Sequence, residues 1–178
     1  RMGYTYYRTN RRFSSALDMA RVQPSVYTLR ASIETAGNLL YAFSSLSGQK
    51  RSEGAYKIFG IQYAQYAKAE FDATWTRNMD SRNAFSFHCG AGIGVPYANS
   101  SMIPFEKRFY AGGANGVRGW GVRALGPGNY DARNSATDFI NQCGDIRLDL
   151  SLEYRAKLFW VFEGALFIDA GNIWTIHN

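Results

Sequence analysis

The sequence predicts an all-β protein with antiparallel strands, and three observations lead to this prediction. Several stretches of ten or more residues alternate between apolar and polar side chains, a period of two that fits a strand and not a helix. Aromatic residues make up 16% of the chain, and 18 glycines accompany only 4 prolines, as is typical of strands joined by turns. Mean hydropathy is −0.29 and no run of about 18 apolar residues occurs, so membrane-spanning helices are not expected.

The first half of the chain contains three expected strands, over about 2–12, 25–36 and 62–77. In the second of these, apolar residues such as Leu29 alternate with polar residues. In the third, five apolar residues ending at Trp75 alternate with charged residues or threonine. Each strand therefore presents one apolar face and one polar face.

Three further strands are expected over about 84–97, 145–156 and 159–174. The strand from 145 is the clearest, because every even position is apolar and every odd position is polar or charged. Its apolar face consists of Ile146, Leu148, Leu150, Leu152 and Tyr154. On the strand over 84–97, the polar face consists of Ser86, His88, Gly90, Gly92 and Gly94.

The connections between these strands differ in length. We expect tight turns at 81–83 and 156–158 and a long loop over 98–144. Segments 13–24 and 39–61 show no clean period and are expected to be loops. Short turns at one end and long loops at the other are typical of outer-membrane barrels.

Strand length and aromatic placement favour a transmembrane β-barrel over a soluble sandwich. The expected strands contain ten or more residues, whereas about 5–6 is typical of soluble sheets and a tilted strand needs about 9–11 to cross a bilayer. Tyr27, Trp75, Tyr154 and Trp174 stand near strand ends, as do the interfacial aromatic residues of membrane barrels. A soluble barrel or sandwich with one solvated face is the alternative.

Charge, cysteines and histidines argue against several kinds of site. The net charge of +6 is spread along the chain and forms no basic patch, so we expect no nucleic-acid partner. Cys89 and Cys143 lack metal-ligand spacing, and either one disulfide or two free thiols fits them. His88 and His177 have no third ligand nearby. We therefore expect no metal site.

The least ordinary stretch runs over 104–120 and contains four glycines, Gly112, Gly113, Gly116 and Gly119. Glycine permits positive φ and close backbone approach. A dinucleotide-binding loop does not fit, because no apolar strand leads directly into the stretch and no helical pattern follows. A phosphate-binding loop does not fit either, because the Gly-Lys-Ser/Thr ending is missing.

This stretch resembles a known signature. Phe109-Tyr110-Ala111-Gly112-Gly113, followed by Val117-Arg118-Gly119-Trp120, is similar to the Val-Arg-Gly-aromatic signature of the outer-membrane insertase superfamily. That superfamily includes the barrel-assembly insertase, the translocation-and-assembly-module barrel, the sorting-and-assembly barrel and two-partner-secretion transporters. Three other segments match it in order, at 102–105, 151–154 and 167–174. Residues 123–128 are most similar to the translocation-and-assembly-module lipoproteins of Bacteroidetes-type bacteria.

The resemblance implies a transmembrane barrel of sixteen strands, of which residues 1–178 would form about six in the C-terminal half. It also implies that N-terminal periplasmic repeat domains and the last strands are absent from this chain. The implied location is the outer membrane of Gram-negative bacteria. The implied partners are unfolded outer-membrane or secreted protein substrates, outer-membrane lipid, and periplasmic or inner-membrane assembly partners.

The resemblance also implies a mechanical site. In the family the signature loop folds into the lumen, and its arginine pairs with acidic groups of the inner wall. Here the loop residues are Val117, Arg118, Gly119 and Trp120 with Gly112 and Gly113, and the acidic partners are Glu153 and Asp169. The alternation places both acids on the polar face. The alternative is a solvated Arg118 and acids that only line a polar lumen.

Three functions are consistent with this reading. The first is an insertase that helps substrates enter the outer membrane without ATP, with no catalytic residue and no cofactor. The second is a protein translocation pore of the two-partner-secretion kind. The third is a passive, porin-like barrel.

Overall fold

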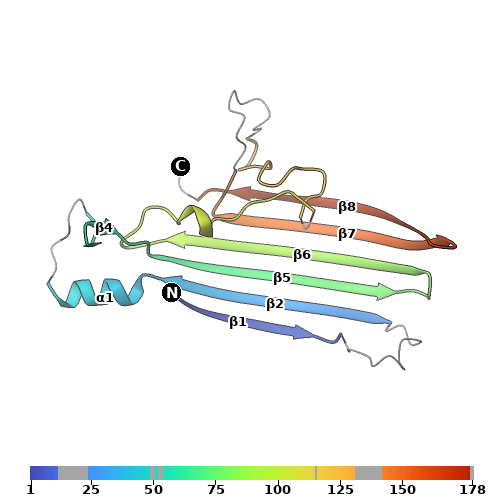
Figure 1. The fold of residues 1–178 in the computed structure, drawn as a ribbon, viewed down its shortest axis with the longest axis horizontal. Coiled ribbons are helices and arrows are strands. Elements are labelled where there is room, and N and C mark those ends of the chain that lie inside the picture. The colour runs from blue at the N-terminus through green and yellow to red at the C-terminus, as the bar shows by residue number, and fades with distance from the viewer. Residues whose placement is uncertain (12–23, 49–50, 52–53, 115, 131–141, 177–178) are drawn as a thin grey trace.

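The computed structural model describes residues 1–11, 24–48, 51, 54–114, 116–130 and 142–176. Six long strands form one sheet in the order β1-β2-β5-β6-β7-β8 (Figure 1). The strands are β1 (Met2–Thr9), β2 (Ser25–Ala36), β5 (Tyr66–Asn78), β6 (Asn83–Pro96), β7 (Ile146–Phe159) and β8 (Phe162–Trp174). Every neighbouring pair is antiparallel. The antiparallel, all-β class expected from the sequence is confirmed.

The register places the alternating apolar residues on one face across the whole sheet. Leu150 of β7 stands opposite Cys89 of β6 and Ala170 of β8, for example. We call this the outer face, and Leu148, Leu150, Leu152 and Tyr154 are all exposed on it. The opposite, inner face carries the glycines and charged residues of β6 and β7.

The sheet is open in the part of the chain that the structure describes. β1 and β8 each pair with a single strand, and no pairing there joins one to the other. The described strands therefore form a section of wall and do not close into a barrel.

The main cluster of buried apolar residues lies between the inner face and the long connection from β6 to β7, which we call the signature loop. Phe109 and Ala111 of this loop pack with Ile173 of β8, and Leu125 packs against them. Ile173 has no exposed surface. Figure 1 shows the loop lying against the β6–β8 part of the sheet. Burial is thus concentrated where the loop meets the wall.

The segment 39–61, expected to be a loop, contains regular structure. Residues Asn38–Leu46 form α1, and β3 (Lys57–Ile58) pairs with β4 (Ile61–Gln62). Gly37 precedes α1 with φ of 81°, and a Cβ there would lie 2.5 Å from the Ala64 carbonyl oxygen. Among the described residues, no helix combines the length and apolar character needed to cross a membrane.

Two expected turns are displaced. The turn expected at 156–158 lies instead between Phe159 and Phe162, because the strands continue to pair and Lys157 stands opposite Glu163. Their Nζ and Oε1 atoms are 3.9 Å apart. The turn expected at 81–83 occupies 79–82, where Asp80 accepts hydrogen bonds from the backbone N–H groups of Arg82 and Asn83.

Two expected strands are shorter than the alternation indicated. The strand expected over 62–77 begins at Tyr66, because Gln62 pairs in the β3–β4 hairpin. The strand expected over 2–12 ends at Thr9, where the Asn10 side chain accepts the Tyr27 N–H and donates to the Ser25 carbonyl. Residue 12 lies outside the described residues.

Candidate functional site

A row of glycines on the inner face of β6 makes room for the signature loop. Cβ atoms added at Gly90, Gly92 and Gly94 would approach other side chains to 2.5, 2.5 and 2.6 Å. These side chains are, respectively, Asp149 of β7, Phe109 of the loop and Ile103 of the loop. Because side chains at Gly92 and Gly94 would occupy this space, the loop can lie directly on the strand, while Gly90 leaves room for Asp149.

The loop presents Arg118 to the inner face of β7 and β8. Its Nε and Nη2 atoms donate to the two carboxylate oxygens of Asp169, at 2.7 and 2.8 Å. Nη1 donates to Glu153, and Nη2 also donates to Ser151 Oγ at 3.0 Å. The guanidinium carbon lies 3.7 Å from the Phe167 ring centroid. We call these five residues the arginine clasp.

The backbone of the loop reinforces the clasp, since the Arg118 N–H donates to Asp169 Oδ2 at 3.0 Å. The Asp169 side chain is only 4% exposed, and that of Glu153 is 12% exposed. The hydrogen bonds to Asp169 and then to Glu153 raise the pKa of Arg118 above its usual range. Two carboxylates on neighbouring strands thus share one permanent positive charge, a geometry suited to the fork of arginine.

The other predicted loop residues fold the chain so that Arg118 reaches the wall. Gly112 and Gly113 have φ of 93° and 91°, a region that favours glycine. The Gly113 N–H donates to the Trp120 carbonyl at 2.9 Å. Val117 is buried against Gly171, whereas Trp120 is half-buried and Gly119 exposed. The structure therefore brings Arg118, Glu153 and Asp169 together, whereas Gly119 is exposed to solvent.

A second ionic contact holds the start of the loop, and sequence reasoning missed it. At the end of the short 3-10 helix η2 (Phe105–Lys107), Lys107 Nζ lies 3.2 Å from Glu34 Oε1 of β2. The same carboxylate accepts a hydrogen bond from the Tyr66 hydroxyl at 2.6 Å and pairs with Arg1 at 2.7 Å. The loop is thus tied to β2 as well as to β7 and β8.

We expect Lys107→Met to weaken the attachment of the loop by no more than about 1 kcal/mol, because both partners retain some solvent contact and Glu34 keeps its other partners. Hydrogen exchange at the amides of Lys107 and Arg108, which bond to Pro104 and Phe105, measures this opening. Lys107→Arg is the matched control and should leave exchange unchanged. A loss as large as that from Arg118→Ala would contradict this ranking of the two contacts.

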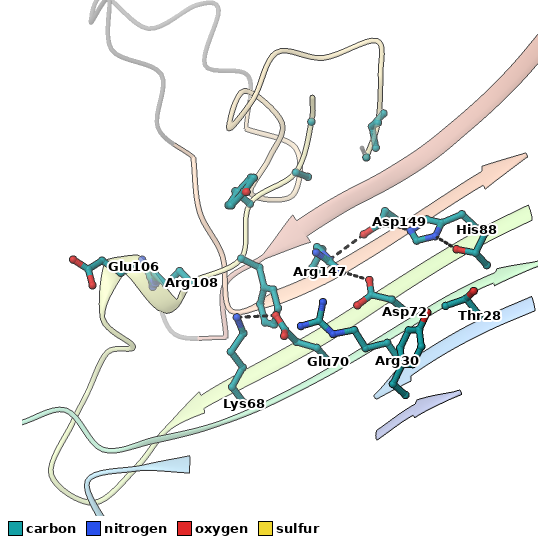
Figure 2. A pocket seen from close by; sticks show the side chains of 18 residues that line it. Thr28, Arg30, Lys68, Glu70, Asp72, His88, Glu106, Arg108, Arg147 and Asp149 are labelled. Carbon is teal, nitrogen blue, oxygen red and sulfur yellow. Dashed lines mark hydrogen bonds and ion pairs between the residues drawn. The ribbon is translucent and has the colours of Figure 1, made fainter. Parts of the chain in front are cut away.

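A network of charged side chains crosses the inner face beside the loop (Figure 2). Arg147 lies between Asp72, at 2.9 Å, and Asp149, at 3.0 Å. His88 Nε2 is 3.1 Å from Asp149, and its Nδ1 is 3.1 Å from Thr74 Oγ1. The network links β5, β6 and β7. Sequence reasoning identified these residues as inner-face residues but not as partners, because pairing depends on register.

The network borders a pocket of about 610 Å³ between the loop and strands β1, β2, β5, β6 and β7. Its lining carries charges of both signs, including Arg30, Lys68, Glu70 and Asp72. In the part of the chain that the structure describes, no group of three or more His, Cys, Asp or Glu residues is arranged to hold a metal ion. Cys89 and Cys143 are both free thiols, and His177 lies outside the described residues.

Comparison with known proteins identifies a family and a relative. The family model described as the Omp85 superfamily domain matches residues 43–178. A relative named outer membrane protein assembly factor BamA, from Neisseria meningitidis serogroup B, is 31% identical over 121 residues. That alignment covers 62% of this chain and 14% of the relative, so the chain spans a small part of the length of the relative. Both matches support the superfamily resemblance of the signature loop.

Proposed function

The chain belongs to the Omp85 superfamily, and from this premise we propose that it is part of an outer-membrane protein assembly factor. The intact protein would help barrel or secreted substrates enter the outer membrane of Gram-negative bacteria. It would act without ATP, catalytic residues or a cofactor. The name of the relative, an outer-membrane protein assembly factor, supports this role.

The observation that carries the proposal is the arginine clasp on the inner face of an antiparallel wall. The outer face is apolar and exposed, whereas the inner face is charged and holds the loop through Arg118. A wall with one apolar face suits lipid, since paired strands satisfy the backbone polar groups that lipid cannot. We propose that the wall belongs to a closed barrel of sixteen strands, as the family resemblance implies.

The mechanism we propose is strand templating. Main-chain hydrogen bonding to an exposed strand edge lets a substrate strand enter the membrane with its backbone already paired. The clasp would keep the signature loop seated on the wall while neighbouring strands move. Substrates would be unfolded outer-membrane or secreted proteins, with periplasmic or inner-membrane assembly partners. The similarity of residues 123–128 supports a finer proposal, the translocation-and-assembly-module lipoprotein type.

The test is substrate folding by the intact protein reconstituted in phospholipid vesicles. An unfolded small barrel protein is added without ATP, and its folding is followed by protease resistance and gel mobility. We expect folding several-fold faster than in empty vesicles. Equal rates in the two vesicle types, together with steady single-channel conductance, would contradict the proposal and favour a passive pore.

We expect Leu152→Arg to reduce the stability of the reconstituted protein by about 2–4 kcal/mol, the cost of a lipid-facing arginine near the bilayer midplane. Leu152 lies on the outer face, near the middle of the apolar run of β7. Urea unfolding measured by gel mobility gives the free energy.

The matched control is Thr76→Arg. Thr76 lies on the inner face, since it stands opposite Ser86, which stands opposite Glu153. This variant should lose much less stability. The reverse order of the two losses would mean that the faces are assigned the wrong way round.

A further inference from the structure

The hairpin of β7 and β8 ends in five consecutive apolar residues, Leu158, Phe159, Trp160, Val161 and Phe162, which we call the aromatic tip. All five are exposed, Trp160 at 92%. Figure 1 shows the hairpin projecting past the neighbouring β5–β6 hairpin. The turn of that neighbour is mainly polar, with Asp80, Ser81 and Arg82. The aromatic tip therefore differs in composition from the adjacent turn, and its exposed apolar residues need an explanation of their own.

The backbone of the tip makes the presence of tryptophan more unusual. Trp160 has φ of 51°, a conformation that glycine or asparagine adopts with less strain than a bulky residue. Glycine would therefore be the easier residue for this turn. The rings of Phe159 and Phe162 lie beside it, with centroids 5.1 Å apart. A large aromatic side chain at a strained, solvent-exposed position indicates that the ring has a function that offsets the strain of the backbone.

On each strand, the apolar residues of the outer face form a continuous run. The position at which this outer run ends changes from β2 to β8. On β2 it ends at Tyr27, whose register partners lead through Trp75, Phe87 and Leu152 to Ile168 on β8. On β8 the apolar run continues from Ile168 through Leu166 and Gly164 to Phe162, at the aromatic tip. At the end of the sheet that carries the aromatic tip, the apolar surface therefore extends six residues beyond the Tyr27 level on β8, whereas on β2 it stops at Tyr27. β8 is four strand steps from β2.

This shift is what tilted strands in a bilayer require. Strands about 4.8 Å apart and tilted by about 35–45° displace a membrane boundary by roughly 4 Å along the strand at each step. Over four steps the displacement is about 16 Å, or roughly five residues at about 3.3 Å each. At the end of the sheet nearer the signature loop, Asn172 interrupts the outer run on β8. Its side-chain amide donates to the Gly128 carbonyl of the loop. On β2 the run continues to Ile33, whose register partners lead through Ala69, Ile93 and Ile146 to Trp174, so beyond Asn172 the outer face of β8 ends in an aromatic residue.

We propose that the aromatic tip is an interfacial anchor that lies at the level of the phospholipid headgroups, at the end of the wall opposite the signature loop. The inference rests on the proposed function, because it requires the outer face to contact lipid. Tryptophan is enriched at this depth in membrane proteins. The flanking cations Arg155 and Lys157 lie on the inner face and pair with Glu153 and Glu163, so the anchor consists of the apolar side chains of the tip.

The test measures depth at three positions of the intact protein in vesicles of phosphatidylethanolamine and phosphatidylglycerol. Nitroxide labels are attached to Trp160→Cys, Leu152→Cys or Ser81→Cys, each in a background with Cys89 and Cys143 replaced by serine. Collision rates with oxygen and with a water-soluble nickel chelate report depth. We expect Leu152 to be deep and Ser81 to be in water. At Trp160 the nickel collision rate should be several-fold below that at Ser81 and well above that at Leu152.

Two outcomes overturn the anchor while leaving the proposed barrel intact. Nickel access at Trp160 equal to that at Ser81 places the tip in water, and access equal to that at Leu152 places it in hydrocarbon. Water access at Leu152 itself contradicts the membrane barrel and the anchor with it. Quenching of native tryptophan fluorescence by brominated lipids avoids the labels. There, Trp160→Phe should remove a component quenched best by shallow bromines, and an unchanged quenching profile overturns the anchor.

Discussion

Replacing Arg118 with alanine is expected to release the signature loop from the wall while the strands remain paired. The substitution leaves Asp169, which is 4% exposed, and Glu153 without their main cationic partner. Removing one partner of a buried ion pair costs about 3–5 kcal/mol. Because the Arg118 side chain is 24% exposed, we expect the lower limit, about 3 kcal/mol, or roughly a hundredfold increase in the population of the open loop.

Limited trypsin cleavage after Arg123 measures this opening, since its guanidinium is held over the rings of Phe105 and Tyr110 in the seated loop. Gel mobility of the folded protein should stay unchanged, and substrate folding in vesicles should slow. Arg118→Lys is the control, because it keeps the charge but not the fork, and should recover part of the loss. If Arg118→Ala left both cleavage and substrate folding at wild-type rates, the clasp would have no role in holding the loop.

The faces of the long strands could be predicted from sequence because alternation alone determines them. The even residues of β7 lie on the exposed face and the odd ones on the inner face, as the pattern at 146–154 indicated. Arg118, Glu153 and Asp169 could be named because the signature resemblance supplied the loop and the alternation supplied the face. The loop residues and the faces of the strands can both be predicted without the register between neighbouring strands.

What could not be predicted depends on register or on short elements. Arg147 meets Asp72 only because β5, β6 and β7 pair in one particular register, and Lys107 meets Glu34 across 73 positions of sequence that no local pattern connects. The sequence does contain a weak signal for α1, since Leu39, Leu40, Phe43 and Leu46 recur at helical spacing. Nine residues without a capping side chain give too weak a signal to distinguish from a loop.

The displaced turn after β7 has a different cause. Hairpins usually turn at glycine, asparagine or aspartate, and the five residues of the aromatic tip contain none of these. Pairing therefore continues past Ala156 until Trp160 adopts the left-handed conformation. The local preference is overridden at the position that we propose as a membrane anchor. Such conflicts between local preference and structure are expected at functional sites.

Gly92→Val is expected to unseat the loop at the place where it packs most closely on the wall. A Cβ at this position would lie 2.5 Å from the Phe109 ring, which is 3% exposed and central to the buried cluster. The backbone of β6 is fixed by its neighbours on both sides, so the ring must move. Overpacking of this kind costs about 1–3 kcal/mol, and loss of the buried ring adds about 1.5–3 kcal/mol.

Ala91→Val is the matched control, because it enlarges the next residue of the same strand on the outer face. Valine also favours strands, so a loss confined to Gly92→Val would come from the loop and not from β6. We expect Gly92→Val to expose Arg123 to trypsin and to lower the urea midpoint, while Ala91→Val does neither. A second substitution that removes the ring, Phe109→Ala, should relieve the clash in the Gly92→Val background, so the two losses should be smaller together than their sum. Additive losses would mean that Gly92 acts through strand pairing rather than by leaving room for Phe109.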